Sequence, residues 1–111
     1  MIRKVLIACR GAVAVRLLSE FAKSNVRIVA VYTEEDCHSE HVQLADEAIC
    51  IGRTVKSYAS DWERIISAAE ISEADAIHPG DGPLSAHERF AEVCTECGIH
   101  LIKDAEQGGF T

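Results

Sequence analysis

The loop from His78 to Gly82 carries the side chains of this sequence that are best suited to chemistry. It holds the imidazole of His78 and the carboxylate of Asp81 beside Gly80 and Gly82, directly after a short apolar segment. If that segment is a strand, the loop follows its carboxyl end, where open α/β sheets bind ligands. His78 and Asp81 could then act as an acid–base pair. Their residue types alone favour a simpler interpretation, in which His78 bonds to the loop backbone.

A second candidate is the turn at Arg10 and Gly11, between another apolar segment and a helical pattern. The turn occupies the place of a dinucleotide-binding fingerprint but lacks its first glycine. Glu34 and Glu35, after the next predicted strand, would suit a ribose hydroxyl. We favour a structural turn in which Gly11 allows a helix to pack close to a strand, although Arg10 could still face an anion beside the helix N-terminus. Any ligand is therefore expected at Arg10, Gly11 and the loop at residues 78–82.

Cysteine and histidine occur in two groups whose spacing resembles metal-ligand motifs. The first group is Cys37, His38 and His41, and the second is Cys94, Cys97 and His100. We expect neither to bind a metal, because Cys94 and Cys97 fall on the apolar face of a predicted helix and His38 lies in a polar segment. The five cysteines form no regular framework and are interpreted as reduced thiols. No catalytic residue and no metal ligand is assigned.

Alternating strand and helix patterns run along the chain and must position these residues. Strands are predicted at residues 4–9, 26–32, 48–52, 74–78 and 99–102, and helices at 11–24, at 40–45 and after residues 60 and 85. Apolar strands that alternate with helices indicate a parallel sheet covered on both faces. We predict an α/β fold, an open doubly wound parallel sheet of about five strands in the order 3-2-1-4-5.

Capping signals mark the predicted helix ends. Asn25 fits the left-handed position that ends a helix, and Gly98 fits the end of the last one. Residues 60–63 and 85–88 have the spacing of capping boxes, in which the first serine caps the helix and the glutamate reaches back.

Length and charge restrict the possible partners. The 111 residues predict one domain at residues 1–102 and a flexible tail at 103–111. Eleven Lys and Arg against 18 Asp and Glu give a net charge of −7, which argues against nucleic acid, since phosphate binding needs a basic surface. No apolar run approaches the roughly 20 residues of a membrane span, and the N-terminal run is too short for a signal peptide. We expect a cytoplasmic protein that binds neither nucleic acid nor membrane.

Four segments together resemble one known family. Residues 4–16, KVLIACRGAVAVR, are similar to the opening KVLIANRGEIAVR of biotin carboxylases, and residues 41–52 to their HVxLADEAxxIG stretch. Residues 65–70 and 74–82 match IIxAAE and ADAIHPGYG. The resemblance covers residues 2 to about 102 in order and implies the N-terminal, Rossmann-like domain that precedes the ATP-grasp.

The resemblance implies a function for the whole enzyme. Family members serve acetyl-CoA, propionyl-CoA, pyruvate and related carboxylases, the first of them in fatty acid biosynthesis. They use ATP and magnesium to activate bicarbonate and then carboxylate biotin. The family holds ATP, metal and bicarbonate mainly with its ATP-grasp and C-terminal domains. We therefore expect this chain to bind none of these cofactors by itself.

Departures from the family pattern gather near the candidate loop. Cys9 stands where the family has asparagine, Ala12 where it has glutamate, and Pro83 where it has an apolar residue such as phenylalanine. Asp81 replaces the tyrosine that lines the biotin pocket of the family. An aspartate cannot offer the flat apolar surface of a tyrosine ring. This pattern suggests a domain that kept its fold and changed its function.

Three functions remain open from the sequence. The favoured one is a biotin carboxylase N-terminal domain, part or relic of a carboxylase, which is inactive alone. Such a domain could pair with carboxylase subunits, or with a second copy of itself through residues such as Arg16 and Glu20. The second is a module that binds an anionic or nucleotide-like ligand, or a regulatory partner of a carboxylase. The third is an independent enzyme built on His78 and Asp81.

Overall fold

Five short apolar segments form one sheet in the computed structural model, which describes residues 2–53 and 57–103. The strands are β1 (Lys4–Ile7), β2 (Arg27–Tyr32), β3 (Glu47–Cys50), β4 (Ala76–His78) and β5 (His100–Leu101). All neighbouring strands are parallel, and their order is β3-β2-β1-β4-β5. The predicted fold class and strand order are confirmed.

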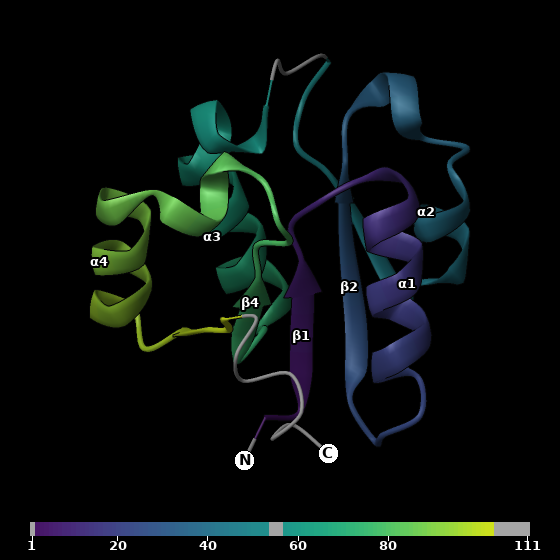
Figure 1. Cartoon of the computed structure of the whole chain (residues 1–111), viewed down its shortest axis with the longest axis horizontal. Coiled ribbons are helices and arrows are strands. Elements are labelled where there is room, and N and C mark those ends of the chain that lie inside the picture. Colours follow the sequence, from purple (N-terminus) through teal and green to yellow (C-terminus); the bar gives the residue numbers. More distant parts are fainter. Residues whose placement is uncertain (1, 54–56, 104–111) are drawn as a thin grey trace.

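Helices cover both faces of this sheet. They are α1 (Gly11–Phe21), α2 (Glu40–Leu44), α3 (Trp62–Ser72) and α4 (Glu88–Glu96), with 3-10 turns η1 (Glu34–Asp36), η2 (Tyr58–Asp61) and η3 (Pro83–Ala86). α1 and α2 lie on one side of the sheet, and α3 and α4 lie on the other (Figure 1). Within the described residues, no helix is long and apolar enough to cross a membrane.

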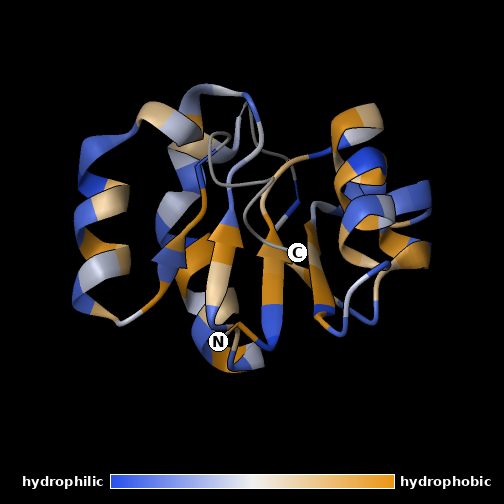
Figure 2. Ribbon diagram, turned by 60° about the horizontal axis from the view of Figure 1, so that its bottom comes forward, coloured by the Kyte–Doolittle hydropathy of each residue, from blue (hydrophilic) through white to orange (hydrophobic). Residues whose placement is uncertain are grey.

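The core consists of two apolar layers that share β1. Val5 and Ile7 point to the α1 side, where they pack in one cluster with Leu17. Leu6 points to the opposite side and joins a cluster with Phe90 of α4. This alternation explains why β1 is apolar from Val5 to Ile7, and Figure 2 shows the apolar strands enclosed between the helices. Each such fully buried side chain stabilises the fold by about 1.5–3 kcal/mol.

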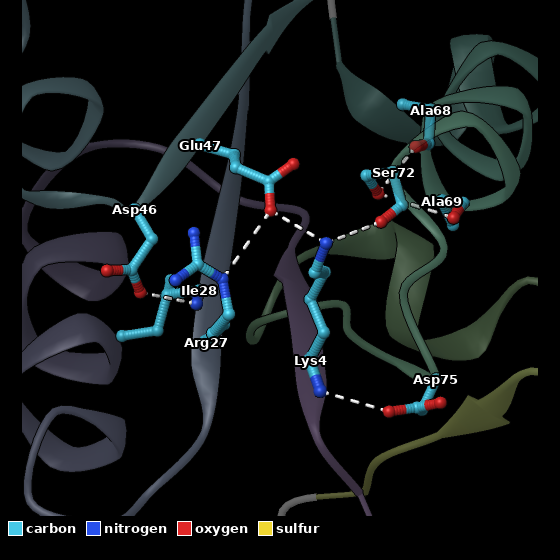
Figure 3. Close-up of polar contacts among 9 residues, drawn as sticks. All are labelled: Lys4, Arg27, Ile28, Asp46, Glu47, Ala68, Ala69, Ser72 and Asp75. Atoms are coloured by element: carbon cyan, nitrogen blue, oxygen red, sulfur yellow. Dashed lines mark hydrogen bonds and ion pairs between the residues drawn. The ribbon is translucent and has the colours of Figure 1, made fainter.

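A polar network joins the amino ends of the strands (Figure 3). One carboxylate oxygen of Asp75 accepts hydrogen bonds from the backbone amides of Arg3 at 2.7 Å and Lys4 at 3.0 Å. The Lys4 ammonium donates to the carbonyl of Ser72 at 2.7 Å and forms an ion pair with Glu47 at 2.7 Å. The network therefore connects β1 with β3 and with the segment between α3 and β4.

The helix ends differ from the prediction in one respect and agree in another. α1 ends at Phe21, and its C-cap residue Ala22 is right-handed with φ −62°. Among the described residues, Glu73 after α3 is the one non-glycine residue with a positive φ, at 61°, so the left-handed cap predicted for Asn25 is wrong. Gly98 follows the last helix with φ +73°, as predicted.

Both predicted capping boxes are also wrong. The hydroxyls of Ser60 and Ser85 donate to backbone carbonyls three residues earlier, at 2.8 Å and 2.7 Å. The two serines lie within 3-10 turns and form hydrogen bonds inside them, and the α-helices begin further along the chain. The N-cap of α3 is Asp61, and α4 is capped by His87, whose Nδ1 accepts the backbone amide of Phe90 at 3.1 Å.

Strand ends were predicted too long in several places, because flanking apolar residues are buried without being paired. Residues 8, 74 and 102 are buried but lie outside the strands. The predicted tail falls, apart from Lys103, outside the described residues.

Candidate functional site

The topology opens a crevice between β1 and β4. The chain runs from β1 outward through β2 to β3 and then returns to β4 on the other side of β1, so the connections after β1 and β4 lead to helices on opposite faces of the sheet (Figure 1). Ligands of doubly wound sheets bind at this switch point. A cavity of about 220 Å³ lies there, lined by Ala8, Cys9, Arg10, Tyr58, Asp81 and Gly82 among others. The crevice contains three of the predicted ligand-binding residues, Arg10, Asp81 and Gly82.

The guanidinium of Arg10 is already engaged by two carboxylates. Its Nη2 bonds to the carboxylate of Asp36 and lies 3.5 Å from the carboxylate of Glu35, both in η1. The same group lies 5.8 Å from the centre of the Tyr58 ring. Partial burial lowers the pKa of Arg10, but the hydrogen bond and charge of Asp36 outweigh this effect and leave the pKa raised. An anionic ligand would have to compete with Asp36 and Glu35 for this cation.

His78 is the last residue of β4 and the first of the candidate loop. Its side chain is 1% exposed, and its Nδ1 accepts the backbone amide of Gly80 at 3.0 Å. The ring also packs edge-on against Phe21 of α1, with ring centres 6.2 Å apart. This is the backbone hydrogen bond that the residue types favour. Asp81, by contrast, is exposed at the tip of the loop.

The glycines of the two turns have different roles from those expected. Gly11 has φ +71°, but a Cβ there would meet no atom within 4 Å. Its conformation therefore demands glycine, and the predicted close packing of helix on strand at Gly11 is wrong. The close approach occurs at Gly80, where φ is +75° and a Cβ would lie 2.7 Å from the Cβ of Cys9. Cys9 and Gly80 thus hold the β1 and β4 loops against each other.

Two further side chains of the crevice keep their protons at neutral pH. Burial, with the negative charge of Asp81, raises the pKa of the Cys9 thiol to about 12. Burial also raises the pKa of Tyr58 to about 12, and its hydroxyl donates to the carbonyl of Val31 at 3.3 Å. Cys9 is therefore not prepared as a nucleophile. The arrangement suits binding better than proton transfer or nucleophilic attack.

Tyr58 was missed at the sequence level. It lies in a polar segment without periodicity. The one signal of burial there is that Tyr58 is an aromatic residue among polar ones. Cys9 was noted as a departure from the family pattern but not as part of the site.

The two groups of cysteine and histidine are not assembled as metal sites. His41 is 1% exposed, whereas Cys37 and His38 are exposed. Cys94 is fully buried, but Cys97 is exposed, so the predicted placement of Cys97 on the apolar face is wrong. In residues 2–53 and 57–103, no three side chains of Cys, His, Asp or Glu gather to hold a metal ion.

The residues proposed for a dimer contact are paired within one chain. Arg16 and Glu20 form an ion pair across one turn of α1, at 3.1 Å. Exposed pairs of this kind are weak, about 0.3–0.5 kcal/mol, and leave both side chains able to form other contacts.

Comparison with known proteins identifies the family. The sequence model of the biotin carboxylase N-terminal domain matches residues 1–107. A biotin carboxylase of Halalkalibacterium halodurans is 47% identical over 104 residues, which are 92% of this chain and 23% of that protein. The mitochondrial alpha subunit of methylcrotonoyl-CoA carboxylase from Mus musculus is 48% identical over 103 residues, which cover 91% of this chain and 14% of the subunit.

Solved structures agree with these relatives. The biotin carboxylase domain dimer of 2-oxoglutarate carboxylase from Hydrogenobacter thermophilus, solved with ADP, magnesium and bicarbonate, superposes with a TM-score of 0.85 at 40% identity, over 91% of this chain and 22% of that one. Biotin carboxylase from Campylobacter jejuni gives a TM-score of 0.86 at 40% identity, over 91% of this chain and 23% of that one. The chain therefore belongs to the biotin carboxylase N-terminal domain family, and it spans about a quarter of the length of these biotin carboxylases.

Proposed function

We propose that this chain serves as the N-terminal domain of an ATP-dependent biotin carboxylase and does not turn over alone. The observation that carries the proposal is the match of residues 1–107 to this one domain, together with the 23% of the Halalkalibacterium halodurans enzyme that the match covers. The remaining three quarters of such an enzyme would supply the catalytic groups. Carboxylase subunits or a second copy are the proposed partners, and a cytoplasmic location remains a prediction.

The crevice does not fit the ligands of the complete enzyme. ATP and bicarbonate are anions, yet the only crevice cation among the described residues, Arg10, is bound by Asp36 and Glu35. Those two carboxylates are in turn engaged by Arg10, and no third side chain of the described residues joins them as a ligand for magnesium. The ring of Tyr58 faces Arg10 and is buried, so it offers no open platform for biotin. We therefore derive no catalytic step from this chain.

What the chain supplies is a carboxyl edge whose two loops contact each other. The loops after β1 and β4 are held by the Cys9–Gly80 approach and by the bond from Gly80 to His78. Such an edge can pack against the following domain and fix its position, which is the contribution of a positioning domain.

A chimera tests this proposal directly. Residues 1–103 of this chain would replace the matching segment of the Halalkalibacterium halodurans biotin carboxylase, and bicarbonate-dependent ATP hydrolysis would be measured with and without free biotin. We expect the chimera to hydrolyse ATP in response to biotin, and the chain alone to show no hydrolysis above background. The relative with its own domain and the relative without this domain are the controls.

Two results would contradict the proposal. Biotin-dependent turnover by the 111-residue chain alone, proportional to its concentration, would show an independent enzyme. A chimera that fails to assemble or to react, while the relative with its own domain does both, would show that this chain no longer fits a carboxylase.

A further inference from the structure

The crevice presents a carboxylate above an apolar floor. Asp81 is exposed on the rim, and none of the hydrogen bonds or ion pairs found among the described residues uses its side chain. We call the apolar part of the crevice lining its floor. It includes Ala8, Val13 and Leu84, of which Ala8 and Leu84 are buried. The crevice thus combines an apolar surface with a carboxylate that pairs with no cation in residues 2–53 and 57–103.

The charges around the crevice leave it negative. Among the described residues that line the crevice, Arg10 is the one cation. It faces the two carboxylates of Glu35 and Asp36, and Glu34 beside them is exposed. The charge of Asp81 reaches into the crevice, because it contributes to the raised pKa of Cys9 and exceeds the opposing effect of Arg16 on that thiol. Arg16 itself forms an ion pair with Glu20. A net charge of −7 on the chain adds long-range attraction for basic partners.

We propose that this crevice receives a long basic side chain, lysine or arginine, from a protein segment that packs over the carboxyl edge of the sheet. The methylene stem would lie on the apolar floor while the charged head meets Asp81, which is how such side chains bury their stems and keep their heads at a polar rim. A small cation would leave the floor uncovered. An anion would face Asp81 and would find Arg10 already bound.

This inference goes beyond the proposed function and does not depend on it, because the crevice lies within the chain and needs no carboxylase chemistry. The two can therefore fail separately: a chimera can be active with an empty crevice, and a basic side chain can bind to a chain that supports no turnover.

Nuclear magnetic resonance titration of the isotope-labelled chain at low salt tests the inference. The probe is Nα-acetyl-lysine methylamide, with Nα-acetyl-norleucine methylamide as the same stem without charge and methylammonium as the charge without the stem. We expect the lysine probe to shift the amide signals of Cys9, Tyr58 and Gly82, and to bind more tightly than either control. Its advantage over norleucine should be about 2- to 5-fold, the effect of an exposed ion pair.

Variants of the rim residue sharpen the test. Asp81→Asn should abolish the advantage of lysine over norleucine, and Asp81→Lys should make the corresponding glutamate probe bind more tightly than the lysine probe. Glu92→Gln removes one negative charge from α4, where Glu92 pairs with Arg89 at 3.1 Å, and should leave the lysine advantage unchanged.

Three results would overturn the inference. Equal binding of lysine and norleucine would reduce the crevice to an apolar hollow. Signal shifts outside the crevice, or none at all, would show that no basic side chain binds there. An unchanged lysine advantage in Asp81→Asn would remove Asp81 from the explanation.

Discussion

Replacing Glu73 by glycine should make the protein more stable. Glu73 follows α3 in the left-handed conformation, with φ 61° and ψ 37°, which crowds its Cβ against the following carbonyl. The conformation is held by two backbone bonds that close the helix, from Glu73 to Glu70 at 3.2 Å and from Ala74 to Ala69 at 2.8 Å. The Glu73 side chain is exposed and forms no ion pair or hydrogen bond among those found in the described residues. Its removal therefore sacrifices no contact.

The expected gain follows from two opposing terms. A non-glycine residue in this conformation costs about 1–2 kcal/mol, while glycine costs about 0.5–1 kcal/mol more conformational entropy on folding. Glu73→Gly should therefore raise the free energy of unfolding by up to about 1.5 kcal/mol. The central value of about 0.75 kcal/mol raises Tm by about 3–6 °C for a domain of this size.

Urea denaturation measures this difference, provided that the slope of the transition is unchanged. Glu73→Ala is the matched control, since it removes the same carboxylate but keeps a Cβ in the left-handed conformation. We expect Glu73→Ala to stay within about 0.5 kcal/mol of the parent protein. A Glu73→Gly protein that is no more stable than Glu73→Ala would refute the argument from strain.

Three other changes should have the opposite effect or depend on pH. Gly80→Ala places a Cβ 2.7 Å from that of Cys9 in a left-handed conformation and should lower the free energy of unfolding by about 2–4 kcal/mol. At Gly11 a Cβ meets no atom within 4 Å, so Gly11→Ala should lose only the stability that the left-handed conformation itself costs. Equal losses of stability in the melting curves of the two variants would contradict this. Asp75→Ala leaves the backbone amides of Arg3 and Lys4, at the start of β1, without their acceptor and should cost about 1–3 kcal/mol in urea denaturation. This loss should exceed that of Asp75→Asn, which keeps an acceptor oxygen. Burial lowers the pKa of His41 in the folded chain, so the unfolded chain takes up this proton first as the pH falls through about 6.5, and the free energy of unfolding should decrease below that pH. The His41→Phe variant should lack this pH-dependent part of the stability. If the free energies of unfolding of the variant and the parent protein, from denaturation curves, decrease equally from about pH 7 to 5, His41 does not contribute to the pH dependence.

The sheet could be predicted because uninterrupted apolar runs that alternate with helical patterns are typical of strands in a parallel sheet. The run from Val5 to Ile7 is such a segment, and these residues of β1 are buried. Cap positions were less predictable. Ser60 and Ser85 have capping spacing, but their hydroxyls bond to nearby carbonyls in 3-10 turns, and a local sequence pattern cannot distinguish these two choices.

The positions of Arg10 and Asp81 in the fold were predicted, but their contacts were not, and their role as ligand-binding residues stays a prediction. Arg10 and Asp81 follow strands that were correctly placed, so both reach the carboxyl edge. The carboxylates that neutralise Arg10 come from η1, 25 and 26 residues further along the chain, and Tyr58 comes from another connection. Side-chain partners so distant in sequence depend on how the loops pack, which periodicity does not report.

The amino-edge network has a consequence for how this fold can be altered. The bonds of Asp75 and Lys4 join β1, β3 and the start of β4 on the side of the sheet opposite the crevice. Exchange of the crevice loops leaves these bonds intact, so the domain tolerates new loop sequences as a scaffold tolerates grafted ones. A library randomised at residues 81–83, with Gly80 retained, should therefore yield mostly folded proteins. The fraction of members that are soluble and melt cooperatively would measure how little the stability of the amino edge of the sheet depends on the loops at its carboxyl edge.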